Sequence, residues 1–135
     1  PLDEELPRIQ AMAEKVFRVH GDKAPEMLGG LLETFTALKA ELEPHMMKEE
    51  QVLFPMIKAG NGAFATGPVS VMQHEHEEAG ALLRRLNELT NGYTVPEGAC
   101  NTWTALWHAL ADLERALHEH IHLENNILFP RALAT

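Results

Sequence analysis

Four long segments of the 135-residue chain carry apolar residues at alternating spacings of three and four, and this pattern constrains the fold more than any other feature. Such spacing places the apolar side chains on one face of an α-helix, which then buries that face in a core. Turn-forming Gly, Pro and Asn residues cluster between the segments, near residues 21, 60 and 92. Four amphipathic helices with short connections predict an all-α fold, an antiparallel up-down-up-down four-helix bundle.

The composition of the chain limits the partners that it can have. The formal net charge is −9 at pH 7, which argues against binding to nucleic acid or to an anionic membrane surface. No apolar run approaches the roughly 20 residues that a membrane-spanning helix needs. Cys100 is the one cysteine, which excludes an internal disulfide framework and fits a reducing compartment. We therefore expect a single soluble, cytoplasmic domain.

Two stretches of the sequence repeat the same chemically reactive residues. HMMKEEQVLFP begins at His45 and HIHLENNILFP begins at His120, and each has a glutamate four residues after the histidine and a terminal Leu-Phe-Pro. These histidines and glutamates, and His76 in the third segment, stand where the apolar pattern requires Leu. The candidate site residues, all expected inside the bundle, are His45, Glu49, His76, His120 and Glu124.

Buried polar and ionic groups need compensating partners. An uncompensated group of this kind costs several kcal/mol, against a total stability of about 5–15 kcal/mol for a domain. Two buried carboxylates repel each other unless a cation lies between them, and neutral imidazole is the commonest metal ligand. We therefore predict a metal site rather than a purely structural polar network. A dinuclear site rich in nitrogen and oxygen donors favours iron or manganese over tetrahedral zinc.

The candidate site residues are expected to lie at nearly the same level along the bundle axis, as ligands of a single site must. His45 and His120 each lie ten residues before the Pro of Phe-Pro, in helices that run in the same direction. His76 is eight residues into a helix that starts beside the Phe-Pro end, which leaves a mismatch of only ~3 Å. His20 also lies on an apolar stripe, but about 25 Å from this level, and is expected to be a helix-end residue. The ligand from the first helix should lie near residue 1 or just before it.

Two acidic residues and two aromatic residues flank the expected site. Glu41 lies one turn before the first site histidine, and Glu75 lies next to the histidine of the third segment. Either these two glutamates belong to a solvated helix face, or they form a proton relay or an iron exit path. Phe54 and Phe129 are expected to close the end of the bundle below the site.

The order His-x-x-x-Glu, with more imidazole than carboxylate, resembles the hemerythrin-like superfamily rather than ferritin-like sites, which use Glu-x-x-His. Within this superfamily the chain is similar to the repair-of-iron-centres proteins, a di-iron family that repairs iron–sulfur clusters. The resemblance is carried by KVFRVHGDK, HMMKEEQVLFPMIK, GPVSVMQHEHEEAG and HIHLENNILFPRAL. It implies two iron ions bridged by an oxo group and by carboxylates. The ligands that match are His45, Glu49, His76, His120 and Glu124.

The resemblance also implies a role and a domain organisation. Residues 1–135 would form a hemerythrin-like di-iron domain that is truncated at its N-terminus. A further histidine just upstream of LDEELP and a small N-terminal domain with a Cys-Cys motif, both typical of the family, are not in this sequence. The implied role is the repair of iron–sulfur clusters damaged by nitric oxide or oxidants, with the centre as iron donor and iron–sulfur proteins as targets. Two alternatives stay open, a di-iron enzyme that reduces nitric oxide (NO) and a hemerythrin that binds O2 or senses redox state.

Overall fold

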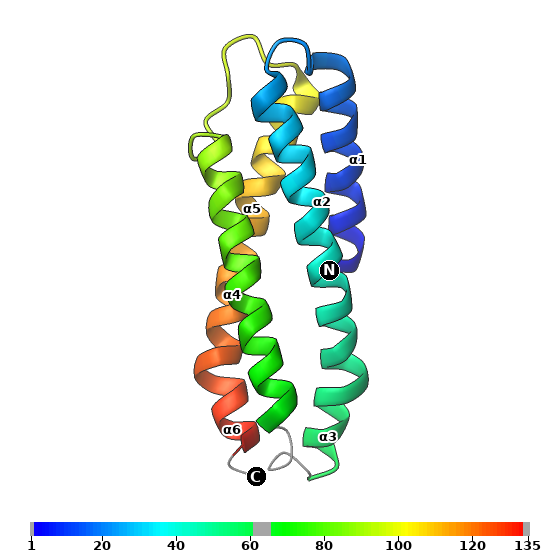
Figure 1. The fold of residues 1–135 in the computed structure, drawn as a ribbon, viewed down its shortest axis with the longest axis vertical. Coiled ribbons are helices and arrows are strands. Elements are labelled where there is room, and N and C mark those ends of the chain that lie inside the picture. Colours follow the sequence, from blue (N-terminus) through cyan, green and yellow to red (C-terminus); the bar gives the residue numbers. More distant parts are fainter. Residues whose placement is uncertain (1, 61–65, 134–135) are drawn as a thin grey trace.

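The computed structural model describes residues 2–60 and 66–133, where all regular structure is helical. Figure 1 shows long helices that lie side by side and run up and down the molecule in turn, and the predicted up-down-up-down bundle is confirmed. The elements, in chain order, are α1 (Leu2–His20), α2 (Pro25–Lys48), the π-helix η1 (Glu49–Leu53), α3 (Phe54–Lys58), α4 (Thr66–Leu89), α5 (Asn101–Leu123), the π-helix η3 (Glu124–Leu128) and α6 (Phe129–Leu133). Within the described part of the chain, no helix combines the length and the apolar character that crossing a bilayer requires.

Local sequence explains where several helices begin and end. Pro25 is the first residue of α2, a position where its missing N–H removes no helical hydrogen bond. Cys100 is the N-cap of α5, and its Sγ accepts a hydrogen bond from the backbone N–H of Trp103 at 3.4 Å. Gly60 follows the end of α3 and Gly92 follows the end of α4, with φ angles of 79° and 69°. Glycine adopts these left-handed conformations without a side-chain clash.

The apolar stripes predicted from the sequence form the core. The main cluster occupies the bundle from its upper end to the level of Leu42 and Leu117. It also includes Trp107, which is fully buried and whose Nε1 donates a hydrogen bond to the carbonyl of Thr94 at 2.9 Å. A second, smaller apolar cluster lies toward the other end of the bundle and consists of Leu53, Val69, Met72 and Phe129. The polar residues between these two clusters form the candidate site.

The apolar pattern shifts in register at the two π-helices. At the α-helical period, the apolar stripes that pass through Glu49 and Glu124 continue to Val52 and Ile127 and predict that both are buried. These two residues are each 44% exposed, and Phe54, expected at the closed end, is 40% exposed. Leu53 is fully buried instead. A π-helix has i→i+5 hydrogen bonds and therefore adds a residue to the turn, which moves the buried face along by one position. The predictions for Val52 and Ile127 were wrong for this reason. The expectation for Phe54 was also wrong, whereas the burial of Phe129 is confirmed.

The first helix lies beside one half of the bundle. α1 packs against α2 and α5, and the Gln10 amide donates a hydrogen bond to Thr36 Oγ1 at 2.9 Å. Figure 1 shows that the N-terminal end of α1 lies near the middle of the bundle. The lower part of α2, with η1 and α3, extends beyond this end, and the candidate site lies in that lower part.

Candidate metal centre

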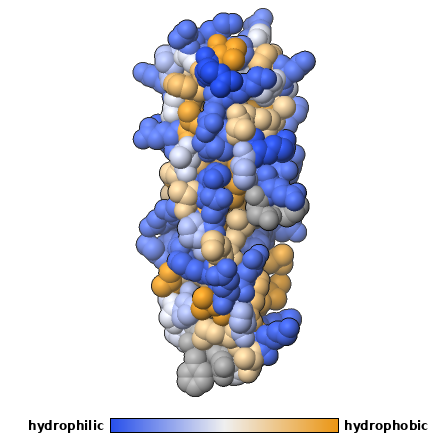
Figure 2. All heavy atoms as spheres, turned by 90° about the vertical axis from the view of Figure 1, so that its right-hand side faces the viewer, coloured by the Kyte–Doolittle hydropathy of each residue, from blue (hydrophilic) through white to orange (hydrophobic). Residues whose placement is uncertain are grey.

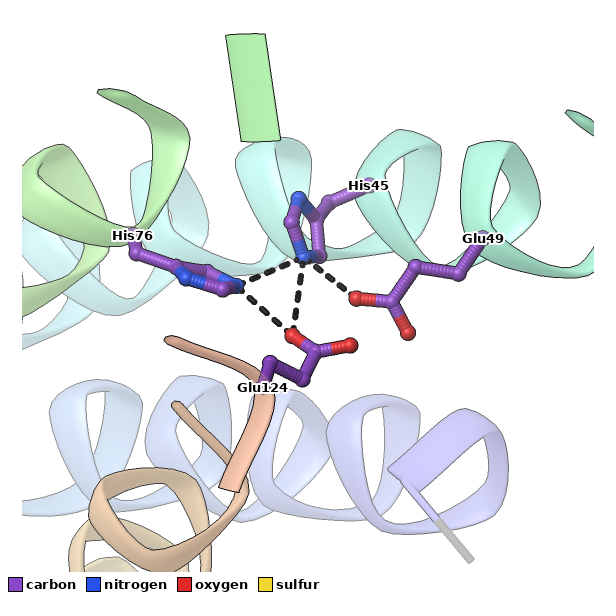
Figure 3. Close-up of side chains that lie close together, drawn as sticks. All are labelled: His45, Glu49, His76 and Glu124. Carbon is purple, nitrogen blue, oxygen red and sulfur yellow. Dashed lines mark hydrogen bonds and ion pairs between the residues drawn. The ribbon is translucent and has the colours of Figure 1, made fainter. Parts of the chain in front are cut away.

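The structure brings the five predicted site residues together, four in the interior of the bundle and one at its edge. Four of them are buried, with 3–6% of their surface exposed, and come from α2, η1, α4 and η3 (Figure 3): His45, Glu49, His76 and Glu124. A ligand atom from each of these four lies within 4.8 Å of the others. His120, from α5, lies at the edge with a side chain that is 40% exposed. Its Nε2 is 3.2 Å from Glu124 Oε1 and 3.6 Å from Glu49 Oε2.

The ring nitrogens and carboxylate oxygens of the four buried residues point toward one another, as Figure 3 shows. His45 Nε2 lies 2.7 Å from Glu49 Oε1, and His76 Nε2 lies 2.8 Å from Glu124 Oε1. The two Nε2 atoms are 3.1 Å apart. Residues four apart on a helix share a face, which explains how each His-x-x-x-Glu pair delivers a nitrogen and an oxygen to one place.

The buried carboxylate oxygens lack hydrogen bonds in spite of these short distances. Among the residues that the structure describes, Glu49 Oε1 and both oxygens of Glu124 have no hydrogen-bond partner. The contacts with imidazole nitrogens are therefore close approaches without hydrogen-bond geometry. A buried carboxylate oxygen in this state is expensive unless a cation is close by. The mixture of imidazole and carboxylate ligands suits a transition metal such as iron better than Mg²⁺ or Ca²⁺, which prefer oxygen ligands alone.

Both glutamates are the first residue of a π-helix. Glu49 begins η1 and Glu124 begins η3, so that each His-x-x-x-Glu pair spans the change from α- to π-helix. π-Helical turns are rare and often occur at functional sites. These π-helices were not predicted from the sequence, although the sequence contains a signal for them. The inward-facing positions His45, Glu49 and Leu53 are separated by two successive intervals of four residues. An interval of four, repeated, is longer than the 3.6-residue period of an α-helix.

The second ring nitrogens of the two buried histidines also have partners. His45 Nδ1 lies 3.3 Å from Glu75 Oε1, and the other oxygen of Glu75 accepts a hydrogen bond from Lys48 Nζ at 3.0 Å. His76 Nδ1 lies 3.0 Å from Asn125 Oδ1. A histidine that binds a metal usually donates its remaining N–H to such an acceptor, which orients the ring. Asn125 was not among the residues predicted from the sequence, and two roles were open for Glu75.

A small cavity adjoins the site on the side of the main core. Its volume, counted as space open to the centre of a water-sized sphere, is about 10 Å³, roughly enough for one water molecule. The lining comprises Glu41, Leu42, His45, Glu75, His76, Ala79, Leu117, His120 and Ile121. Burial, followed by the neighbouring carboxylates of Glu78 and Glu75, raises the pKa of Glu41. Glu41 and Glu75 therefore line a cavity at the site, and their role as a relay or an exit path stays a hypothesis.

In the metal-free protein, the buried carboxylates of the site favour the protonated form of neighbouring imidazoles. Burial alone would lower the pKa of His45, but the carboxylates of Glu124 and Glu49 outweigh it and raise that pKa to about 10. The same two carboxylates raise the pKa of His120 to about 10. Burial alone would raise the pKa of Glu124, but the imidazoles of His120, His45 and His76 outweigh it and lower that pKa. A metal ion must therefore displace protons from His45 and His120.

The other histidines lie away from this cluster. His20 is the last residue of α1, as expected, and its Nε2 lies 3.1 Å from Cys100 Sγ. Its ring centroid is 5.2 Å from that of Trp103, at the end of the bundle opposite to the site. The remaining four are exposed on the outer faces of α4 and α5: His74, His108, His118 and His122.

The sequence of the chain is similar to the sequences of known proteins. The chain is 56% identical over 130 residues to the iron–sulfur cluster repair protein YtfE of Pectobacterium atrosepticum, covering 96% of this chain and 58% of that protein. It is 55% identical over 131 residues to YtfE of Escherichia coli O81, covering 97% of this chain and 59% of that protein. The chain thus spans somewhat less than two thirds of these curated relatives. The family model described as the hemerythrin HHE cation binding domain matches residues 1–132, and the chain belongs to this hemerythrin family.

Proposed function

We propose that this chain is the iron-binding part of a protein that repairs iron–sulfur clusters damaged by nitric oxide or oxidative stress. The observation that carries the proposal is a buried cluster of imidazoles and carboxylates in which Glu49 Oε1 and both oxygens of Glu124 lack hydrogen bonds. The chain also has more than half of its residues in common with proteins named for such repair. Iron–sulfur proteins are then its targets, and the free thiol of Cys100 is consistent with a reducing cytoplasm.

The arrangement of the site supports two iron ions. Glu49 and Glu124 approach the centre from two different columns of the bundle, which is the placement that bridging carboxylates need. Imidazoles from three helices surround them and would complete the nitrogen ligands: His45, His76 and His120. When bound, iron would supply both the ions to be transferred and a redox change that weakens their binding.

An exposed apolar surface on the side of the bundle below the N-terminal end of α1 supports a further ligand from the first helix. Leu123 lies seven residues after Ala116, and therefore on the side of α5 that faces α1 higher in the bundle. Leu123 is 47% exposed, and Figure 2 shows apolar side chains on the surface in the lower half of the face that contains α1. We propose that, in a longer form of the protein, residues just before residue 1 continue α1 over this side and add one histidine.

A second function is favoured by the small cavity beside the site. Its lining is apolar on the side away from the metal ligands, where Leu42, Ala79 and Leu117 meet. An apolar space of this size next to bound iron suits a small neutral molecule such as NO or O2. The centre could then reduce NO, or bind O2 as a sensor, without giving up its iron.

Iron transfer to a damaged target distinguishes the two functions. The chain is loaded with Fe(II) under anaerobic conditions and mixed with an iron–sulfur protein whose cluster has been destroyed by NO. Recovery of the cluster, followed by its electron paramagnetic resonance signal, is expected with the loaded chain and not with a Glu49→Leu/Glu124→Leu variant. Equal recovery with the same amount of free Fe(II) would contradict the proposal. Consumption of NO with the iron retained would support the second function.

A further inference from the structure

Asn125 contacts the ring nitrogen of His76 that is turned away from the site carboxylates. Its Oδ1 lies 3.0 Å from His76 Nδ1, and an amide oxygen can only accept a hydrogen bond. His76 Nδ1 therefore carries the hydrogen, which leaves Nε2 of the neutral ring without one. That Nε2 lies 2.8 Å from Glu124 Oε1 and 3.1 Å from His45 Nε2. The bare nitrogen, the one that can bind a metal, thus faces the carboxylates.

The stretch that contains Asn125 holds His76 from more than one direction. Asn125 is the second residue of η3, directly after Glu124. Phe129, the first residue of α6, stacks on the His76 ring with a centroid distance of 5.8 Å and an interplanar angle of 9°. Stacking limits tilting of the ring, but it does not distinguish the two nitrogens. The hydrogen bond to Asn125 makes that distinction.

Asn125 also lies where the two repeated motifs differ. The equivalent position after the first glutamate is Glu50, which is exposed and makes no hydrogen bond or ion pair among the described residues. The acceptor for His45 is the carboxylate of Glu75, whose charge is shared with Lys48. A carboxylate at position 125 would add a further negative charge beside Glu124. The amide orients His76 without adding that charge.

We propose that Asn125 is a positioning residue that keeps His76 in the Nδ1–H form and so presents Nε2 to the metal. The effect on metal binding rests on the proposed function, whereas the effect on the ring is a property of the metal-free protein. Loss of a partner of this kind typically weakens metal binding about 10–100-fold. The chain offers a matched control in Asn126, which is exposed and bonds to His122 rather than to His76.

Metal affinity is the first measurement. Fe(II) binding is measured by competition with a coloured chelator for the wild type, Asn125→Leu, Asn125→Asp and Asn126→Leu. Asn125→Leu should lose about 10–100-fold in affinity, while Asn126→Leu should stay close to the wild type. Asn125→Asp keeps an acceptor oxygen and should not show the loss seen in Asn125→Leu. Equal affinity in the wild type and Asn125→Leu would overturn the proposed effect on metal binding.

The tautomer of His76 is the second measurement and needs no metal. The ¹⁵N spectrum of the metal-free protein at alkaline pH, with His76 assigned by its loss in His76→Gln, reports which ring nitrogen carries hydrogen. The Nδ1–H form is expected in the wild type and Asn125→Asp, and its loss in Asn125→Leu. An Nε2–H form in the wild type itself would overturn the inference, even if Asn125→Leu does not fold. If none of the proteins binds Fe(II) but these spectra are as expected, the proposed metal function fails and the role of Asn125 in orienting His76 stands.

Discussion

The Nε2 atoms of His45 and His76 lie 3.1 Å apart in the interior of the bundle, although 31 positions separate the residues. Each atom also faces a carboxylate oxygen, that of Glu49 at 2.7 Å and that of Glu124 at 2.8 Å. Two nitrogens and two carboxylates at such distances direct their electron pairs at a common centre. The arrangement needs positive charge there, from protons in the metal-free protein and from metal ions in the loaded protein.

Replacing either buried glutamate with Leu should remove most of the bound iron. Leu suits the buried positions of Glu49 and Glu124, so that the helices should form as before while the bridging oxygens are lost. Metal analysis after loading with Fe(II), together with circular dichroism, tests both parts. Glu50→Leu is the matched control, because Glu50 is the exposed neighbour of Glu49 in the same π-helix. Unchanged iron content in both Glu49→Leu and Glu124→Leu would show that neither carboxylate binds the metal.

The sequence predicted the bundle and the convergence of the candidate site because both follow from helical periodicity. His45, His76 and Glu124 stand on apolar stripes, and the stripes must face one core. Features that depend on approach between helices could not be predicted this way. The contact between His76 and Asn125 joins residues 49 positions apart, and no periodicity encodes it. The error at Val52 has a local cause, since a constant α-helical period was carried through a π-helix.

Substitution of His76 and substitution of His20 should differ strongly in their effect on metal binding, although both residues lie on apolar stripes. His76→Ala removes a buried nitrogen of the cluster, and should weaken iron binding by more than the roughly 10–100-fold that the loss of an orienting partner causes. His20→Ala removes a contact with Cys100 at the other end of the bundle and should leave iron content unchanged. His74→Ala, an exposed position two residues from His76, is the local control. A loss of iron in His20→Ala as large as that in His76→Ala would mean that His20 acts on the site across the length of the bundle.

Iron binding should release protons and become tighter as the pH rises from neutral. The pKa values of His45 and His120 are both raised to about 10, so that both rings are protonated at neutral pH in the metal-free protein. A metal ion takes the place of these protons. Titration calorimetry in buffers with different ionisation enthalpies measures the number of protons released per ion bound. An apparent binding enthalpy that does not depend on the buffer would contradict the protonated state of the site.

The metal-free protein should lose stability as the pH rises from about 6.5 to about 10. The pKa of His45 is about 10 in the folded protein because of Glu124 and Glu49, against about 6.5 for an unfolded histidine. A pKa raised on folding contributes stability that is complete below the unfolded pKa and disappears as the pH passes the folded pKa. His120 adds to this less than its pKa suggests, because its side chain is 40% exposed and solvent screens the interaction. The lowered pKa of Glu124 acts in the opposite direction, with stability lost as the pH falls below about 4.5.

Denaturant unfolding of the metal-free protein over this pH range measures the effect. The control is the Glu49→Leu/Glu124→Leu variant, in which the carboxylates that raise the two histidine pKa values are absent. Groups that the two substitutions do not touch contribute to the pH dependence of both proteins, and their contribution cancels in the difference. The free energy of unfolding should therefore fall more steeply with pH in the wild type than in the variant, and the difference should level off above pH 10. Parallel curves for the two proteins would mean that Glu49 and Glu124 do not hold protons on His45 and His120.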